Sequence, residues 1–430
     1  MNQFIEPKIL QGTRDFLPEQ MAKRDYVLEK IKTVFTKFGY DAIETPAIEY
    51  AETILGKYGE EGSKLVYRFK DNGDRDICLR YDQTVPFARV VAANYKTLPM
   101  PFKRYQIGRV WRADRPAKGR YREFYQCDID IIGTQSLVAE AEIAKVMAEV
   151  FTALGFSKFK IKFNSRRLIN SILKDLNIPA ENQAGMIRIL DKMDKLSLPE
   201  IKQELKSLAS DSEASKLLEL VCVEGSSNDR LSLFQKYNTT EIQEFLKIAK
   251  GFGIPDEALV FDPSLARGLD YYTGVIFEVY IPEVDIGAVC AGGRYDDLCS
   301  LFCPEKFSGV GVAFGFDRII VAMEQLKLLD EISLNSQALV AYFDAATLPD
   351  SLKILGDIQT AGLKAEIYFE PAKIAKQLKY ADKKNIPFVV MCGSDEKERG
   401  EVTIKMMKTG KQKTIPQDQI INYFKGYSSL

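Results

Sequence analysis

The chain has 430 residues, of which 46% are hydrophobic and 28% are charged, and its net charge is -1. At about 150 residues per domain, this length predicts two or three domains. No apolar run approaches the roughly 20 residues of a membrane-spanning helix, and the amino terminus does not have the pattern of a secretory signal, so we expect a cytosolic protein.

The seven cysteines are odd in number and contain no Cys-x-x-Cys pair. Cys299 and Cys303 could share a helix face, but scattered cysteines in a reducing compartment are usually small buried hydrophobic residues, so we expect no zinc site. The sequence contains no histidine, which excludes histidine-dependent triads and histidine metal sites. Chemistry must therefore come from carboxylates, cations, amides and hydroxyls.

Apolar residues recur at helical spacing from residue 20 to 38 and predict a helix that ends at Gly39. Residues 42–50 are extended but contain Pro46, which places them at a sheet edge or an interface. The runs 65–70 and 76–81 flank a glycine turn and predict a hairpin. We expect strands to dominate from there to Ile132, in an antiparallel sheet.

A second helix is predicted over 137–154. Residues from about 166 to 255 have short helical patterns with few strand formers, which indicates a helical insertion. Strand patterns return at 268–279, 287–291 and 309–313, and a helix is predicted over 316–326.

From residue 337 the pattern alternates between short strands and helices, which is typical of a separate α/β domain. This segment has 14 basic and 11 acidic residues. Its positive charge suits contact with RNA.

The segment from Lys103 to Arg122 has eight basic residues and one acidic residue, Asp114, and its apolar residues alternate as in a half-buried strand. Arginines on such a strand need anionic partners. Phosphate is one candidate, because a guanidinium binds it through two parallel hydrogen bonds. An internal network of arginine–carboxylate pairs is the alternative.

Three segments resemble the signature motifs of class II aminoacyl-tRNA synthetases. GYDAIETPAIE (39–49) resembles the first motif, whose proline lies at a dimer interface. YQIGRVWRADRPAKGRYREFYQCDIDIIG (105–133) resembles the second, in which a strand arginine meets the ATP α-phosphate. GVGVAFGFDR (309–318) resembles the third, in which a glycine-rich strand enters a helix carrying a nucleotide-binding arginine.

LARGLDYYTGVIFE (265–278) makes the resemblance specific to the histidyl family. It is supported by GTRDFLP (12–18), LRYDQTVPFAR (79–89) and AGGRYDDL (291–298). YADKKNIPFVVMCG, near the carboxyl terminus, resembles that family's anticodon-binding module. The resemblance implies an α+β catalytic domain on an antiparallel sheet over 1–330, with the insertion at about 166–255, and a carboxyl-terminal α/β anticodon-binding domain over 337–430.

The resemblance also implies a reaction. Histidine and ATP, with Mg²⁺, would give histidyl-adenylate and pyrophosphate, and a homodimer would then transfer histidine to the 3′ end of tRNA(His). Activation brings two anions together, so fixed cations are required. We expect Arg112 to bind the α-phosphate and the carboxylate. Arg267 resembles the family's catalytic arginine, with a salt bridge to Asp270 as the alternative.

The resemblance assigns Arg120 and Arg318 to the outer phosphates of ATP and the Phe124 ring to adenine, with a plain core role as the alternative for Phe124. The loop 115–119 would meet the acceptor end of the tRNA, with Lys118 on a phosphate. A merely solvated Lys118 is the alternative.

Recognition of histidine requires partners for two ring nitrogens. Asp130, Tyr271 and Tyr272 match family positions of this kind, although the family commonly has glutamate in place of Asp130. Tyr-Asp-Gln-Thr (81–84) replaces the Pro-Glu-Gly-Thr of many bacterial members and is more similar to the eukaryotic form. The expected histidine-binding residues are Asp82, Gln83, Thr84, Gln126, Asp130, Tyr271 and Tyr272.

Two other functions remain to be weighed. A catalytically silent relative that senses histidine would typically lack the anticodon module and a complete Arg-Gly-Leu-Asp-Tyr-Tyr segment, and this chain has both. A class II synthetase for threonine, proline or glycine would not need the Tyr-Tyr pair with Asp130. The absence of histidine is open to two explanations, adaptation to histidine scarcity and drift in composition.

Overall fold

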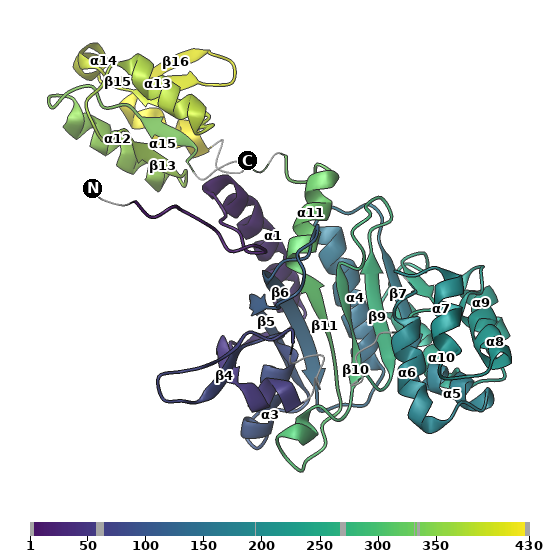
Figure 1. Cartoon of the computed structure of the whole chain (residues 1–430). Coiled ribbons are helices and arrows are strands. Elements are labelled where there is room, and N and C mark those ends of the chain that lie inside the picture. The colour runs from purple at the N-terminus through teal and green to yellow at the C-terminus, as the bar shows by residue number, and fades with distance from the viewer. Residues whose placement is uncertain are drawn as a thin grey trace. The chain divides into compact units, whose positions relative to one another are not determined.

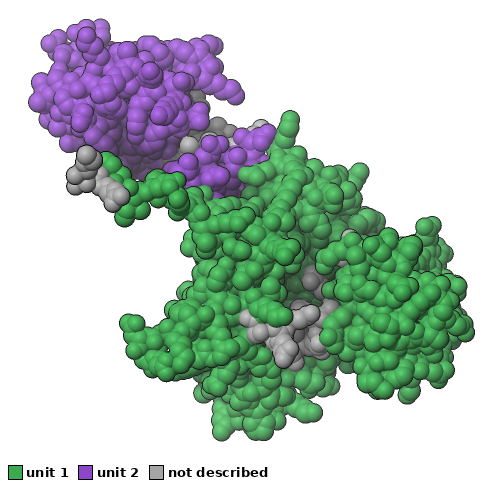
Figure 2. Space-filling view, viewed as in Figure 1, with its two compact units in different colours: residues 1–15, 27–328 green, residues 16–26, 329–430 purple. Residues whose placement is uncertain are grey.

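The computed structural model describes residues 4–56, 64–193, 195–266, 272–330, 332 and 336–425 (Figure 1). The chain divides into two compact units (Figure 2). One unit comprises residues 1–15 and 27–328, and the other comprises residues 16–26 and 329–430.

The first unit is built on an eight-stranded sheet. Its six central strands are antiparallel to one another, and each edge strand is parallel to its neighbour. The antiparallel sheet predicted from the sequence is therefore present, with parallel edges added. In spatial order the strands are β1 (Asp41–Ala42), β5 (Phe102–Trp111), β6 (Glu123–Ile132), β11 (Gly309–Gly315), β10 (Cys290–Tyr295), β9 (Val275–Tyr280), β7 (Lys160–Ser165) and β8 (Leu259–Phe261).

The two faces of this sheet differ sharply along β11. Val310, Val312 and Phe314 alternate with glycine and alanine, and the larger residues form one apolar face. On that face Phe314 contacts Phe35 of α1 (Pro18–Lys37) and Phe151 of α4 (Val138–Ala153), with ring centroids 5.5 and 6.0 Å apart. Helices therefore cover one face, and the small residues lie on the other.

A small three-stranded sheet lies between α1 and β5 in the chain. It contains β2 (Ile48–Tyr50), β4 (Asp76–Leu79) and β3 (Arg68–Lys70), and β3 and β4 form the predicted hairpin. Strands dominate up to Ile132 as expected, but α3 (Thr84–Asn94) lies among them and was not predicted. Val85, Phe87, Ala88 and Val91 of α3 are buried, so their apolar run fills a helix face and not a strand.

Within the residues that the structure describes, the predicted helical insertion forms six helices between β7 and β8. Ser210 and Ser226 each accept a hydrogen bond from the backbone three residues on, and Glu213 and Asp229 bond back to them. These capping boxes explain why the segment breaks into short helices. The helices are α5 (Arg166–Asp175), α6 (Ala180–Leu190), α7 (Leu198–Leu205), α8 (Asp211–Val221), α9 (Ser227–Leu233) and α10 (Thr240–Gly251).

After β11, α11 (Phe316–Gln325) closes the first unit, and the second unit has a five-stranded mixed sheet. The alternation of short strands and helices predicted from residue 337 is present in it. Its strands and helices are β12 (Ala338–Val340), α12 (Leu348–Thr360), β13 (Ala365–Ile367), α13 (Ile374–Lys383), β14 (Phe388–Met391), α14 (Ser394–Arg399), β15 (Glu401–Met406), β16 (Gln412–Pro416) and α15 (Ile420–Lys425).

Gly311 is a position in the sheet where no side chain fits. A Cβ atom there would lie 1.9 Å from Oδ1 of Asp130 and 2.7 Å from the carbonyl oxygen of Ile129, so the backbone would have to move. We expect Gly311→Ala to lower the free energy of unfolding by about 1–3 kcal/mol in urea. Gly251→Ala, where nothing lies within 4 Å, is the control and should cost nothing. Equal stability of the two variants would contradict this packing.

Candidate active site

The open face of the large sheet carries a row of polar side chains from β5 and β6. Directly opposed residues in an antiparallel pair point to the same side. The register opposes Arg104 to Asp130, Gln106 to Asp128 and Gly108 to Gln126. Alternate residues of both strands therefore form one polar face.

Small residues form the floor beside this row. Gly311 and Ala313 of β11 pair with Asp130 and Asp128, and Gly293 and Ala291 of β10 continue the line. Ala291 and Ala313 are partly exposed although they lie in central strands. A central strand that is open at its small residues leaves room for a ligand against the sheet.

Asp130 is held by two donors from the protein. The Tyr295 hydroxyl donates to Oδ1 at 2.6 Å, and Nη2 of Arg104 lies 2.6 Å from Oδ2. Burial raises the pKa of Asp130 above its ordinary value, and Arg104 and Tyr295 oppose this shift. The residue lies on the open face, and both of its oxygens already have partners, so its role in binding the histidine ring stays a prediction.

The residues from Asp82 to Thr84 lie at the start of α3 and join the same row. The backbone N–H of Val85 donates to Asp82 at 3.1 Å, so Asp82 helps to begin the helix. Nε2 of Gln83 donates to the carbonyl oxygens of Gly108 at 3.0 Å and Gln126 at 3.3 Å. The structure thus brings these three predicted residues to β6 beside the predicted Gln126.

Asp128 is a buried residue of this row that the sequence analysis missed. Neither of its carboxyl oxygens has a hydrogen-bond partner among the described residues. Burial raises the pKa of Asp128 well above its ordinary value, while Arg104 lowers it and the Asp130 charge raises it further. The sequence could have indicated Asp128, because it lies midway between the predicted site residues Gln126 and Asp130, and alternate residues of a strand point to the same side.

Arg112 differs from the other cations of its segment. Its Nε donates to the carbonyl oxygen of Tyr81 at 3.1 Å, and its guanidinium lies 4.3 Å from the centroid of the Tyr81 ring and 5.3 Å from that of Phe124. In the described parts of the chain it forms no ion pair with a carboxylate. Arg112 therefore keeps its charge for an anionic ligand, and the partly exposed Phe124 ring lies beside it.

The internal network of arginine–carboxylate pairs, which we considered as an alternative to phosphate, holds for four other cations of this segment. These pairs are Lys103–Glu142 at 2.6 Å, Arg104–Asp130 at 2.6 Å, Arg109–Glu123 at 3.6 Å and Arg120–Asp114 at 3.3 Å.

The loop between β5 and β6 ends in a tight turn in which Ala117 and Arg120 exchange backbone hydrogen bonds of 3.0 and 2.9 Å. Gly119 takes a positive φ of 69° in this turn. The Lys118 side chain is exposed, as expected for either a phosphate contact or simple solvation. Arg120 is also exposed.

Contacts around α11 join the segments that resemble the second and third motifs. The Arg14 guanidinium lies 3.2 Å from the centroid of the Tyr121 ring and 2.7 Å from Asp317, which also accepts from the Tyr125 backbone at 2.9 Å. Nη1 of Arg318 donates to the carbonyl oxygen of Ala288 at 2.8 Å. Nε of Arg318 donates to the carbonyl oxygen of Gly119 at 3.4 Å. Arg318, which was predicted to bind the nucleotide, therefore lies beside the β5–β6 loop.

Part of the predicted site lies outside the described residues, namely Arg267, Asp270 and Tyr271. Tyr272 is buried in a cluster with Leu265 and Ile276. The roles expected for Arg267 and Tyr271 therefore stay predictions from the sequence.

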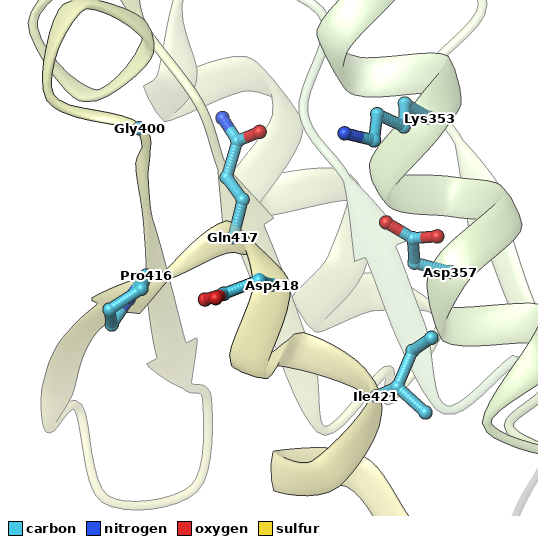
Figure 3. A pocket seen from close by; sticks show the side chains of 7 residues that line it. All are labelled: Lys353, Asp357, Gly400, Pro416, Gln417, Asp418 and Ile421. Atoms are coloured by element: carbon cyan, nitrogen blue, oxygen red, sulfur yellow. The ribbon is translucent and has the colours of Figure 1, made fainter.

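Two pockets lie away from this face. One, of about 530 Å³, is lined by Glu140, Arg167 and Arg294 among others. The other, of about 480 Å³, lies in the second unit between Lys353, Gln417 and Ile421 (Figure 3). Neither contains a residue predicted to bind histidine or ATP. The polar row lies instead on an open sheet face.

Comparison with known proteins decides the family. Residues 12–319 match the family model described as histidyl-tRNA synthetase, and residues 337–427 match that of an anticodon binding domain. The chain belongs to the histidyl-tRNA synthetase family. Histidine–tRNA ligases of Phocaeicola vulgatus and Cytophaga hutchinsonii are 40% and 38% identical to it over 449 residues. These alignments cover 97% of this chain and 98% and 99% of the two relatives.

The fold agrees with membership of the histidyl-tRNA synthetase family. The crystal structure of histidyl-tRNA synthetase from Nostoc sp. PCC 7120 matches with a TM-score of 0.88 at 28% identity. The match covers 99% of this chain and 100% of the other. The predicted class II catalytic fold with a carboxyl-terminal anticodon-binding domain is thus confirmed. Within the described residues, no helix has the length and apolar character needed to span a membrane.

We predict that Asp128→Asn raises the melting temperature and that the gain grows as the pH rises from about 4 toward neutrality. The pKa of Asp128 is raised in the folded protein, so the wild type loses up to about 1.4 kcal/mol of stability per pH unit above the unfolded pKa. Asparagine does not ionise and avoids this loss. Thermal unfolding across this pH range tests the prediction.

The exposed Asp256→Asn is the matched control and should show no such gain. A variant at Asp128 that melts below the wild type at every pH would contradict the prediction.

Proposed function

We propose that this chain is a cytoplasmic histidine–tRNA ligase. It activates L-histidine with ATP to histidyl-adenylate and pyrophosphate, and it then transfers histidine to the 3′ end of tRNA(His). Membership of the histidyl-tRNA synthetase family supports the reaction. The single structural observation that carries the proposal is Arg112, a cation without an ion pair among the described residues, beside a row of buried polar side chains.

The chemistry requires a carboxylate to approach the α-phosphorus of ATP, so like charges must be brought together. Arg112 supplies a fixed cation for the α-phosphate and for the histidine carboxylate. Arg267, in Arg-Gly-Leu-Asp-Tyr-Tyr, is proposed as the second catalytic cation from its family motif. Mg²⁺ is expected to enter with the ATP phosphates, which are its usual ligands.

The remaining ATP contacts follow from the position of Gly119, where the β5–β6 loop contacts α11. Arg318 donates to the Gly119 carbonyl, and Arg120 is exposed in the same turn, so both guanidiniums can turn toward the outer phosphates. The Phe124 ring lies beside Arg112 and offers a surface for adenine. Lys118, exposed at the tip, is proposed to contact the acceptor end of the tRNA.

Histidine is proposed to lie on the small-residue floor beside β6. Asp82, Gln83, Thr84 and Gln126 gather there around the start of α3 and would hold the α-amino and carboxylate groups. The imidazole would lie toward Asp130, whose partners Arg104 and Tyr295 fix its position. Tyr271 and Tyr272 complete the set proposed to bind the ring.

We propose residues 1–330 as the catalytic domain, with the insertion at about 166–255, and residues 337–430 as the anticodon-binding domain. Helices α5 to α10 support the insertion boundaries. The second compact unit resumes at residue 329, and the anticodon-binding match begins at residue 337. Single-stranded tRNA bases would bind this domain.

The experiment that tests the proposed function is amino-acid-dependent exchange of labelled pyrophosphate into ATP, with all twenty amino acids. We expect exchange with histidine alone, and aminoacylation of tRNA(His) with the same specificity. Arg112→Ala and Arg267→Ala should each lower kcat/KM for exchange by about 100- to 1,000-fold, because each removes a cation from the developing charge. Arg109→Ala is the control, since Arg109 lies on the other side of β5 and pairs with Glu123.

If a different amino acid supported pyrophosphate exchange and histidine did not, that amino acid would be the substrate. Binding of histidine without any exchange would instead favour the histidine-sensing regulator.

We also propose a homodimer that forms around the first motif. Ile48 and Tyr50 are 49% and 52% exposed on β2, which is an edge strand, and Pro46 is exposed before them. An exposed apolar edge is normally covered by a partner. We expect a solution mass of twice the chain mass, and a monomer for Ile48→Asp but not for Leu198→Asp, which alters a similarly exposed leucine of α7. A monomeric wild type would contradict the dimer.

A further inference from the structure

Four buried acceptor atoms gather on the open face of the sheet. They are Oε1 of Gln83, Oε1 of Gln126 and both carboxyl oxygens of Asp128, and none has a hydrogen-bond partner among the described residues. All three residues are almost fully buried; Gln126, at 7% exposed, is the most open. Buried polar atoms normally have partners, so a group of unpartnered acceptors indicates a missing donor.

The three residues are neighbours on one face. Gln126 and Asp128 are two residues apart on β6 and therefore point to the same side. A Cβ atom on Gly108, which opposes Gln126, would lie 3.3 Å from Nε2 of Gln83. The Gln83 amide therefore lies over Gly108 on this same face. Its Nε2 is already used on the Gly108 and Gln126 carbonyls, which leaves its oxygen as the available atom.

The chemistry of the cluster selects a cation with several N–H donors. A carboxylate accepts only, and Nε2 of Gln83 already donates to two carbonyl oxygens, so Asp128 and Gln83 offer acceptors and the ligand must donate to them. An ammonium group supplies three donors and the positive charge that a desolvated carboxylate requires. An imidazole ring supplies at most two donors, and in its neutral form it also requires a donor from the protein.

The neighbouring charges separate Asp128 from Asp130. Arg104 and the Tyr295 hydroxyl hold Asp130, whereas Asp128 makes no such hydrogen bond among the described residues. The charges within electrostatic reach of Asp128 are, from the largest effect to the smallest, Arg104, Asp130, Asp82 and Arg112. Arg112 is the proposed partner of the substrate carboxylate. The ammonium of an amino acid is attached to the same carbon as that carboxylate, so it would lie near Arg112 and against Asp128.

We propose that Asp128, with the side-chain oxygens of Gln83 and Gln126, binds the α-ammonium group of the amino-acid substrate. This inference rests on the proposed function and adds a residue to its histidine-binding set. Asp128 is thus a specificity-determining residue that selects substrates with an α-amino group.

The test is equilibrium binding of three ligands to the full-length protein by calorimetry. Histidine has both charged groups, histidinol keeps only the ammonium, and 3-(imidazol-4-yl)propionate keeps only the carboxylate. We expect Asp128→Asn to raise the Kd of histidine and of histidinol by roughly 30-fold or more, because it removes the partner of a buried charge. The Kd of the propionate should change less than threefold. Asp256→Asn should leave all three values unchanged.

Equal weakening of all three ligands by Asp128→Asn would overturn the inference, because it would place the residue on the imidazole or in the fold. Unchanged binding of histidine would overturn it as well. A failure to fold would appear as a lowered melting temperature. The second variant, Gln126→Glu, adds a negative charge beside the same ammonium and should tighten histidinol relative to the propionate; no change in this ratio would also overturn the inference.

Failure of the proposed function has a different signature, namely a wild-type protein that binds none of the three ligands. The same comparison would then use the amino acid that supports exchange and its deamino analogue, because the α-ammonium is common to all amino acids. A variant at Asp128 that did not discriminate between that pair would again overturn the inference.

Discussion

The ion pair between Arg104 and Asp130 is the interaction on which the open face of the catalytic unit depends. Both side chains are buried, so the pair depends on its geometry and on the hydrogen bonds around it, although Nε and Nη1 of Arg104 have no hydrogen-bond partner among the described residues. Tyr295 supplies one such bond from β10, and Gly311 leaves the space in β11 that the carboxylate occupies. One cluster thus fixes the register of four strands, and this register determines which residues point toward the ligand.

Because of the same register, two neighbouring carboxylates, and likewise two arginines, have different roles. Asp130 is bound by Arg104 and Tyr295. Asp128, two residues earlier on the same face, has no hydrogen-bond partner in the described chain. Arg104 likewise pairs internally, and Arg112 lies on aromatic rings with no carboxylate among its described partners. A buried carboxylate without a partner lowers stability, and such groups persist where function requires them. The ligand site is therefore found where the internal network of charges ends.

Much of this could be predicted from the sequence. The periodicity of residues 20–38 and 137–154 gave α1 and α4, and the motif resemblance gave the family and the β5–β6 hairpin with Arg112 on it. The helix α3 was missed because its run of buried apolar residues has no polar alternation that separates a helix from a strand. Asp128 was missed because a motif assigns roles residue by residue, whereas its role follows from the register of three strands. The partners of Lys103, Arg104 and Arg109 could not be chosen for the same reason, because their carboxylates come from β6 and α4.

The central claim is that histidine and ATP react on the glycine-rich face between β6 and β11. A crystal structure with a non-hydrolysable analogue of histidyl-adenylate tests this claim most directly. The account predicts the phosphate oxygens of the analogue at the Arg112 guanidinium and its ammonium within hydrogen-bonding distance of Asp128. An analogue bound instead in the pocket lined by Glu140 and Arg294, with the β6 face empty, would contradict it.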